Sequence, residues 1–204
     1  MNKSAFFDSL AKEWDSQGVA DISVRLARVV LLSDLQPGQR VLDVGTGTGV
    51  LIPYILEAIG ESGLVVALDI SLQMLKQAKG RMLPPNVHLV HGDMQRAGLK
   101  DESFHRVLCN AVFPHFDDKK TALQEAWRVL RPGGLVVISH PIGREAVNRI
   151  HSQHQAVFED RVPPADKMRT MLTQAGWVDV EVIDEPEFYL ARGRKPISSL
   201  PTGF

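Results

Sequence analysis

The chain has 204 residues, of which 44% are hydrophobic and 23% are charged, and this composition predicts one globular domain with a sizeable core. A net charge of −1 at pH 7, from 23 basic and 24 acidic residues, excludes a protein that its overall charge would draw to nucleic acid or to an anionic membrane. One cysteine, Cys109, no apolar leader and no long apolar run predict a cytoplasmic protein without an internal disulfide or stable membrane insertion.

The predicted elements alternate between short β-branched runs and longer stretches with apolar residues at helical spacing. Strands are predicted at residues 40–44, 64–68, 87–90, 107–109 and 135–139. Helices are predicted after Gly49 to about Ile59, from an N-cap at Ser71 to Arg81, from Asp117 or Asp118 to Leu130, and from Asp166 to about Gly176. A turn is predicted at residues 132–134, and alternation at residues 177–183 and 187–191 predicts an antiparallel C-terminal hairpin. The predicted fold is an α/β three-layer sandwich around a mostly parallel, seven-stranded sheet.

Three glycines at alternate positions, Gly45, Gly47 and Gly49, follow the first predicted strand and precede a helix. Glycine lets a ligand approach the main chain, and the new helix offers free N–H groups to an anionic group. The dinucleotide-binding fingerprint would need a glycine where Val50 stands, and Asp43 would repel a pyrophosphate but suit an ammonium group. The pattern therefore disfavours NAD, and a tight turn that holds no ligand is the alternative.

Acidic residues also follow the second and third predicted strands. Asp69 ends the second, where a carboxylate can accept both hydroxyls of a ribose or can help to start the next helix. Gly92, Asp93 and Met94 follow the third, where Asp93 could accept an adenine amino group while Met94 packs on the ring, with a surface turn as the alternative. Because parallel strands end at one edge of a sheet, these residues predict a single binding cleft.

Four features carry a family resemblance: Val-Leu-Asp-Val-Gly-Thr-Gly-Thr-Gly at residues 41–49, Asp69, the step at residues 92–94, and Arg-Val-Leu-Arg-Pro-Gly-Gly at residues 128–134. Together they resemble the class I S-adenosylmethionine-dependent methyltransferases, which have a Rossmann-like fold, over about residues 36–139. The segment at residues 6–15 is similar to the start of the quinone-biosynthesis branch of that family. Two positions depart from the family pattern: Thr46 replaces a frequent cysteine, and His105 replaces a frequent aspartate.

By this resemblance the cofactor is S-adenosylmethionine and its product is S-adenosylhomocysteine. The glycine loop would approach the methionine part with Asp43 near its ammonium, Asp69 would hold the ribose, and Asp93 with Met94 would hold the adenine. Residues 109–113 would line the site near the sulfonium. The residues expected at the cofactor are Asp43, Gly45, Thr46, Gly47, Gly49, Asp69, Ile70, Met74, Gly92, Asp93, Met94, Asn110 and Ala111.

Three histidines are candidate catalytic bases, because histidine titrates near neutral pH. His115 follows the fourth strand, His140 ends the fifth, and His151 lies in residues 141–165, a polar segment interpreted as either a substrate lid or a solvated helix. The side chains predicted to share one face of that helix are Glu145, Asn148, His151 and His154. The spacing of His151 and His154 matches no strong metal-binding motif, so no metal is predicted, and a site that these two form with His140 and an acidic residue is the alternative.

The chain is thus predicted to be a single methyltransferase domain over residues 1–204. A helical cap at residues 1–35 would place Phe6, Phe7 and Trp14 over the cofactor cleft or against the sheet edge. The predicted function is methyl transfer to a small-molecule acceptor; C- or O-methylation of a quinone-type substrate and a non-catalytic cofactor-binding module are the alternatives. A small molecule is the predicted partner, nucleic acid is not, and a homodimer is left open.

Overall fold

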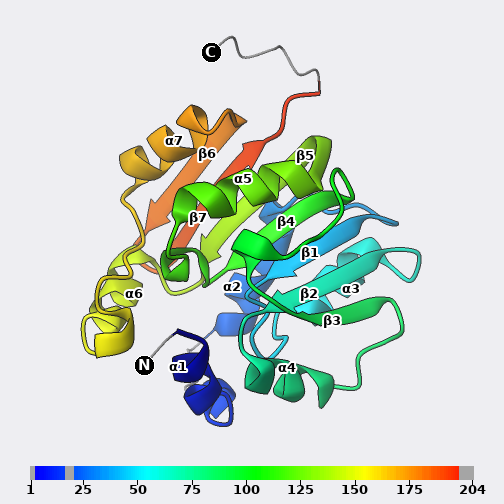
Figure 1. Ribbon diagram of the computed structural model, residues 1–204. Helices are drawn as coiled ribbons and strands as arrows, with labels where there is room; N and C mark the ends of the chain where they lie inside the picture. The colour runs from blue at the N-terminus through cyan, green and yellow to red at the C-terminus, as the bar shows by residue number, and fades with distance from the viewer. Residues whose placement is uncertain (1–2, 17–20, 198–204) are drawn as a thin grey trace.

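A computed structural model describes residues 3–16 and 21–197, and within these residues seven strands form one sheet in the order β3-β2-β1-β4-β5-β7-β6 (Figure 1). The strands are β1 (Arg40–Val44), β2 (Leu64–Asp69), β3 (Val87–His91), β4 (Phe104–Asn110), β5 (Leu130–His140), β6 (Val178–Glu185) and β7 (Phe188–Arg194). Strands β1 to β5 are parallel, and β7 pairs antiparallel with both β5 and β6. The predicted sheet and its C-terminal hairpin are confirmed. The domain and cap boundaries include residues 1–2, 17–20 and 198–204, which lie outside the described residues.

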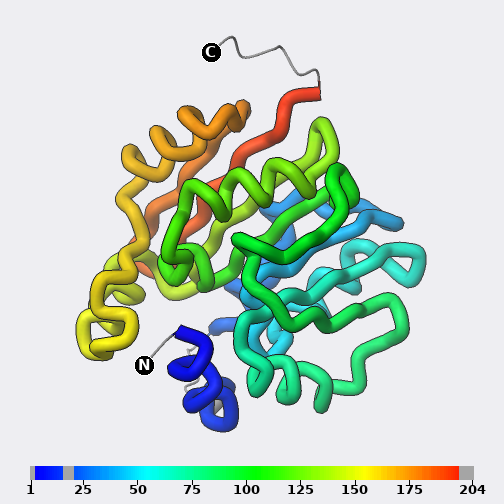
Figure 2. The backbone as a smooth tube through the Cα atoms, viewed as in Figure 1, coloured from blue at the N-terminus to red at the C-terminus, as the bar shows by residue number. Residues whose placement is uncertain are grey.

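Helices cover both faces of the sheet (Figures 1 and 2). On one face, α2 (Ile22–Leu32) and α3 (Ile52–Ile59) bury their apolar sides; on the other, α5 (Lys119–Val129) and α7 (Ala165–Gln174) do so. Burial follows helical spacing: in α5, for example, Ala122, Ala126 and Val129 are all inside. Each helix of the described chain falls short of the length and apolar character that a bilayer span requires.

The remaining helices gather around the carboxyl ends of the parallel strands. Helix α1 (Lys3–Leu10) packs against α4 (Leu72–Lys79), and α6 (Arg144–His151) follows β5. Four short 3₁₀ helices complete the described elements: η1 (Trp14–Ser16), η2 (Met94–Arg96), η3 (Phe113–His115) and η4 (Gln155–Val157). Helix α1 and the segment after β5 are far apart in the sequence but lie side by side at this edge of the sheet (Figure 2).

Two predicted helix starts are confirmed by their capping hydrogen bonds. The Met74 N–H donates to Ser71 Oγ at 3.1 Å, which starts α4. The Lys120 and Thr121 N–H groups donate to Asp118 Oδ1, so Asp118 rather than Asp117 caps α5. Each cap supplies a partner to backbone donors that the first turn of a helix leaves unpaired.

The turn predicted at residues 132–134 lies inside β5 as an irregularity of the strand. Residues 130 and 135 of β5 pair with residues 104 and 106 of β4, so β5 carries extra residues at this point. Pro132 has no N–H to donate, and Gly133 adopts a φ of +76°, so the regular ladder is interrupted and then resumes.

The polar helix predicted after β5 is shorter than expected. Helix α6 ends at His151, and His154 is exposed and begins the separate turn η4. The Glu145 side chain points to solvent with 76% of its surface exposed, whereas Asn148 points inward and pairs with the backbone of Val162. The four predicted side chains therefore do not share one face.

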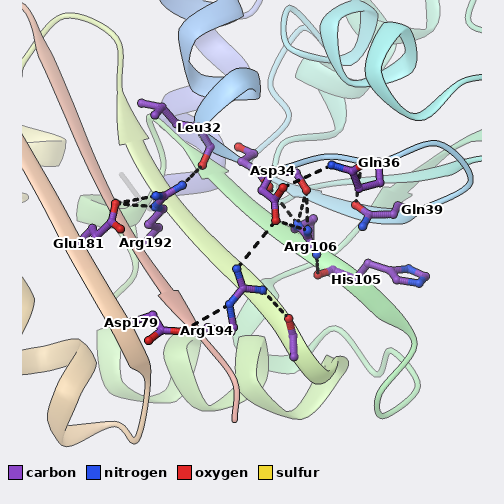
Figure 3. A network of polar contacts seen from close by, with 12 residues as sticks. Leu32, Asp34, Gln36, Gln39, His105, Arg106, Asp179, Glu181, Arg192 and Arg194 are labelled. Carbon is purple, nitrogen blue, oxygen red and sulfur yellow. Dashed lines mark hydrogen bonds and ion pairs between the residues drawn. The ribbon is translucent and has the colours of Figure 1, made fainter. Parts of the chain in front are cut away.

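A polar network holds the opposite edge of the sheet, at the amino ends of the parallel strands (Figure 3). The buried Arg106 guanidinium of β4 donates to the Asp34 carbonyl oxygen and pairs with the Asp34 carboxylate at 3.1 Å. Arg194 of β7 lies 3.9 Å from the same carboxylate, and Arg192 donates to the carbonyl oxygen of Leu32. These contacts tie the end of α2 to β4 and β7, at the edge of the sheet away from the glycine loop.

Gly45 occupies a crowded position at the end of β1. Its φ is +66°, and a Cβ built on it would lie 2.4 Å from the Cγ2 atom of Val112, in the segment after β4. Gly60, which ends α3, has almost the same φ of +67°, but a Cβ there would meet no atom within 4 Å. Both positions have a positive φ that favours glycine, and of the two only Gly45 is crowded.

We expect Gly45→Ala to lower the free energy of unfolding by about 2 kcal/mol more than Gly60→Ala, because both variants strain the backbone but only the first forces atoms to overlap. Urea denaturation of the two purified variants measures this difference. Equal losses of stability would contradict the close packing of the glycine loop on Val112.

Candidate functional site

A cleft opens at the carboxyl ends of β1, β2, β3 and β4, where the sequence placed its binding residues. Its wall takes in the glycine loop, the residues after each strand, and Phe7 and Trp14 from the N-terminal segment. Of the residues expected at the cofactor, the cleft is lined by Gly45, Thr46, Gly47, Asp69, Ile70, Met74, Gly92, Asp93, Met94, Asn110 and Ala111. Asp43 and Gly49 lie behind this wall.

Asp69 organises the centre of the cleft. Its Oδ2 atom accepts the Gly47 N–H at 2.7 Å, and its Oδ1 atom accepts the Ser71 N–H at 2.8 Å. Each carboxylate oxygen has a further lone pair, so the group can still accept from a ligand. Burial raises the pKa of Asp69, although the two backbone hydrogen bonds act in the opposite direction. A Cβ on Gly47 would meet no atom closer than 4.0 Å, which leaves the main chain open to the ligand.

Asp43 supports the loop from inside the protein. Only 1% of its surface is exposed, and Thr46 Oγ1 donates to its Oδ2 atom at 2.6 Å. The pKa of Asp43 is raised to about 6. Burial is the main cause and the charge of Asp69 adds to it, whereas the hydrogen bond from Thr46 acts in the opposite direction. Gly49 packs closely against α4, because a Cβ at this position would lie 3.2 Å from the Cβ of Ala78.

The other end of the cleft combines a carboxylate with apolar surface. The Gln95 N–H donates to Asp93 Oδ1 at 3.0 Å, and Met94 is buried beside them. After β4, Ala111 takes a φ of +57° while its N–H donates to the Ser139 carbonyl oxygen at 2.7 Å. The chain turns sharply here, and this turn exposes its backbone to the cleft.

His115 is the candidate base that reaches the cleft wall. Its Nδ1 atom lies 2.7 Å from Asp160 Oδ2, and the Phe7 ring packs edge-on against it at a centroid distance of 4.9 Å. Because Nδ1 is occupied by the carboxylate, Nε2 is the ring nitrogen left for a bound molecule.

The other two candidate histidines lie behind His115 and do not line the cleft. His140 is 1% exposed at the end of β5, and burial lowers its pKa to about 3, so its ring is neutral at pH 7. His151 is also buried, which lowers its pKa, and its Nδ1–H donates to the Asp160 carbonyl oxygen at 2.6 Å. Neither side chain is among those that line the cleft, and the catalytic roles predicted for them stay predictions.

Several residues at the site carry no local signal in the sequence. Lys3 Nζ donates to the His115 carbonyl oxygen at 2.7 Å and pairs with Asp117 and Asp160 at 2.8 and 3.1 Å. These partners are more than a hundred residues away in the chain, so neither motif nor periodicity could join them. Asp160 was part of the polar segment after β5, but nothing in its surroundings marked it as the partner of His115.

The N-terminal segment is anchored to elements that line the cleft. Ser71 Oγ donates to Asp8 Oδ1 at 2.6 Å, and Thr48 Oγ1 donates to Asp15 Oδ1 at 2.6 Å. Arg81 pairs with the same Asp15 carboxylate at 2.5 Å. The acidic residues of this segment thus hold the glycine loop and the start of α4 while Phe7 and Trp14 cover the cleft.

The part of the chain that the structure describes contains no cluster of side chains that could bind a metal ion. No three histidine, cysteine, aspartate or glutamate side chains there are grouped to hold an ion. His154, half of the spacing considered for a metal, lies outside α6, and its ring faces Phe6 at a centroid distance of 6.1 Å.

Comparisons with known proteins match the cleft-bearing part of the chain to one family. A family model described as a methyltransferase domain matches residues 41–134. A ubiquinone/menaquinone biosynthesis C-methyltransferase of Legionella pneumophila is 34% identical over 142 residues, which cover 65% of this chain and 56% of that protein. A demethylmenaquinone methyltransferase of Renibacterium salmoninarum is 38% identical over 148 residues, 68% of this chain and 59% of that protein. The chain thus spans somewhat more than half the length of these relatives.

The fold matches as well. A SAM-dependent methyltransferase of Aquifex aeolicus superposes with a TM-score of 0.71 at 21% identity, over 92% of this chain and 97% of the other. The fold, the motifs around the cleft and the matched domain confirm the predicted resemblance. The chain thus has the fold and the cleft motifs of the class I S-adenosylmethionine-dependent methyltransferases, and it is similar to proteins of the quinone-biosynthesis branch of that family.

Proposed function

We propose that the chain transfers a methyl group from S-adenosylmethionine to a small-molecule acceptor in the cleft, with His115 as the general base. The observation that carries this proposal is the convergence of the glycine loop, Asp69, Asp93 and His115 on one space. A binding module needs the first three of these features, whereas an imidazole held by a carboxylate beside the same space suits proton transfer.

The residues present fit the cofactor along its length. Gly47 leaves the main chain open to the methionine part, and the Asp69 carboxylate retains lone pairs for the ribose hydroxyls. Asp93 offers an acceptor to the adenine amino group, and Met94 offers an apolar surface to the ring. When bound, the cofactor supplies an electrophilic methyl group and its own leaving group.

This chain's own residues then align the acceptor, exclude water and remove a proton. Phe7 and Trp14 close the cleft from above, and His115 Nε2 is left to receive the acceptor proton. A bound cofactor would give up its methyl group together with the bond to sulfur, while His115 would take the acceptor proton and pass it on to water.

We further propose an aromatic acceptor with an ionisable hydroxyl, such as a phenol or a quinol. Next to His115, the cleft is lined by Phe7, Trp14, Val112 and Phe116, a mainly aromatic and apolar surface. The names of the Legionella and Renibacterium relatives point the same way, and C-methylation of a quinone-type substrate is the second candidate. The homodimer stays a prediction.

Calorimetry followed by an acceptor panel tests the proposed function. We expect S-adenosylhomocysteine to bind and NAD not to bind, and we expect labelled methyl groups from S-adenosylmethionine to enter phenols or quinols in preference to thiols and amines. Binding of NAD alone would overturn the cofactor assignment. Binding of S-adenosylhomocysteine without transfer to any acceptor would favour the non-catalytic module.

His115→Gln should lower kcat about 100-fold or more while it leaves the affinity for S-adenosylhomocysteine within about twofold, because a general base contributes roughly 100- to 10,000-fold. Label transfer and calorimetry measure the two quantities. His88→Gln, at an exposed position on β3, is the matched control and should keep full activity. A fully active His115→Gln variant would exclude His115 as the base.

Asp43 predicts a pH-dependent affinity. With its pKa raised to about 6, the carboxyl is mostly ionised at pH 7 and mostly protonated at pH 5, and only the ionised form attracts the cofactor's ammonium. S-adenosylhomocysteine should therefore bind about tenfold more tightly at pH 7 than at pH 5. Calorimetry of Asp43→Asn should show weaker binding with most of this pH dependence lost. Asp101→Asn, at a largely exposed carboxylate away from the cleft, should retain the full slope.

A further inference from the structure

We propose that Asp160 positions His115 for catalysis and that Lys3 completes this arrangement, so that the base is assembled only while helix α1 is docked on the cleft. The inference rests on the proposed role of His115 as the base. It assigns functions to two residues that do not touch the acceptor, and it makes the N-terminal helix part of the catalytic apparatus.

The first step is the contact between Asp160 and two partners from distant parts of the chain. Asp160 is 8% exposed; its Oδ2 atom lies 2.7 Å from His115 Nδ1, and its Oδ1 atom lies 3.1 Å from Lys3 Nζ. The two oxygens of one carboxylate are thus divided between the imidazole and the ammonium. Neither partner can be withdrawn without leaving a largely buried charge incompletely paired.

The second step concerns the tautomer of His115. Burial raises the pKa of Asp160, but its hydrogen bonds to His115 and Lys3 outweigh burial and leave the pKa below its ordinary value. The carboxylate is therefore ionised at neutral pH and can only accept a hydrogen bond. A neutral His115 must then carry its proton on Nδ1, which leaves Nε2 unprotonated and able to take a proton from an acceptor.

The third step concerns the hydrogen bond between Lys3 and the main chain of His115. Besides its pair with Asp160, Lys3 donates to the His115 carbonyl oxygen at 2.7 Å. Burial lowers the pKa of Lys3, but the pairs with Asp117 and Asp160 outweigh burial and raise it, so the side chain stays charged. Lys3 therefore fixes the main chain of the base and the carboxylate that orients its ring.

The fourth step connects this cluster to the rest of α1. The Phe7 ring contacts the His115 ring, and Asp8 accepts from Ser71 Oγ and from the Gln73 N–H, at the start of α4. One face of the helix thus touches the base while another holds the element that follows Asp69. Departure of α1 would remove Lys3 and Phe7 from His115 together and would open the cofactor end of the cleft.

His151 supports the same geometry from the opposite side. Its ring lies 4.8 Å from the ring of His115, centroid to centroid, and its Nδ1–H donates to the Asp160 carbonyl oxygen. It therefore fixes the backbone of Asp160 as Lys3 fixes its side chain. The catalytic role expected of His151 is replaced in this proposal by a positioning role.

Asp160→Asn is the discriminating variant. Because Lys3 can only donate, the amide oxygen should turn toward Lys3 and the amide NH₂ should turn toward His115 Nδ1, which must then accept. The His115 proton would move to Nε2, and the base would be lost. We expect kcat to fall about 100-fold or more, while the KM for the acceptor and the affinity for S-adenosylhomocysteine change by less than about threefold.

The tautomer can be observed without turnover. Nitrogen-15 NMR of the histidine rings, with the His115 signal assigned by its loss in His115→Gln, should show the Nδ1–H form in the parent protein and the Nε2–H form in Asp160→Asn. An unchanged tautomer in a folded Asp160→Asn variant, or full kcat, would overturn the proposal. Asp101→Asn, at a largely exposed carboxylate away from the cleft, is the control and should leave both readouts unchanged.

Lys3 supplies a second test that does not disturb the interior. Lys3→Gln should lower kcat on the order of tenfold at nearly unchanged cofactor affinity, and Lys3→Arg should restore most of the loss because it keeps the charge. Equal activities of the parent, Lys3→Gln and Lys3→Arg would remove Lys3 from the mechanism. If the parent transfers no methyl group to any acceptor, the proposed function fails, whereas the NMR result still decides whether Asp160 sets the tautomer.

Discussion

The Asp69 carboxylate is the contact on which the arrangement of the cleft depends. It joins the glycine loop to the start of α4 through the N–H groups of Gly47 and Ser71, and Ser71 continues the chain of hydrogen bonds to Asp8 of α1. Hydrogen bonds to a charged acceptor are among the stronger ones in a protein, and an ion so deeply buried needs them. The shape of the cofactor end and the docking of the N-terminal helix are therefore linked through one buried anion.

What the sequence predicted well was decided by neighbours along the chain. The hairpin β6–β7, the cap at Ser71 and the strand that leads into the glycine loop all depend on residues within a few positions of one another. The cleft followed from these elements, because parallel strands must end at a common edge. The residues expected along this cleft, from Gly45 to Ala111, could therefore be chosen without information on long-range contacts.

The parts that escaped prediction depend on packing between remote segments. The sequence does not tell a residue of the cleft wall from one behind it: β5 and β1 bury His140 and Asp43, and the roles expected of both stay predictions. The pairing of Lys3 with Asp160 spans most of the chain. For the same reason, the pattern of polar residues after β5 predicted a longer helix than forms, since contacts to Val162 and Asp160 end α6 at His151.

The reversed direction of β7 has a practical consequence for handling the protein. Its last residue, Arg194, pairs with Leu135 at the start of β5, on the edge of the sheet remote from the cleft, whereas Lys3 sits at the cleft itself. An affinity tag, fluorophore or solid support attached next to Arg194 would leave the cleft unobstructed. The same group attached next to Lys3 would crowd the cleft, so these two positions are unequal as points of attachment.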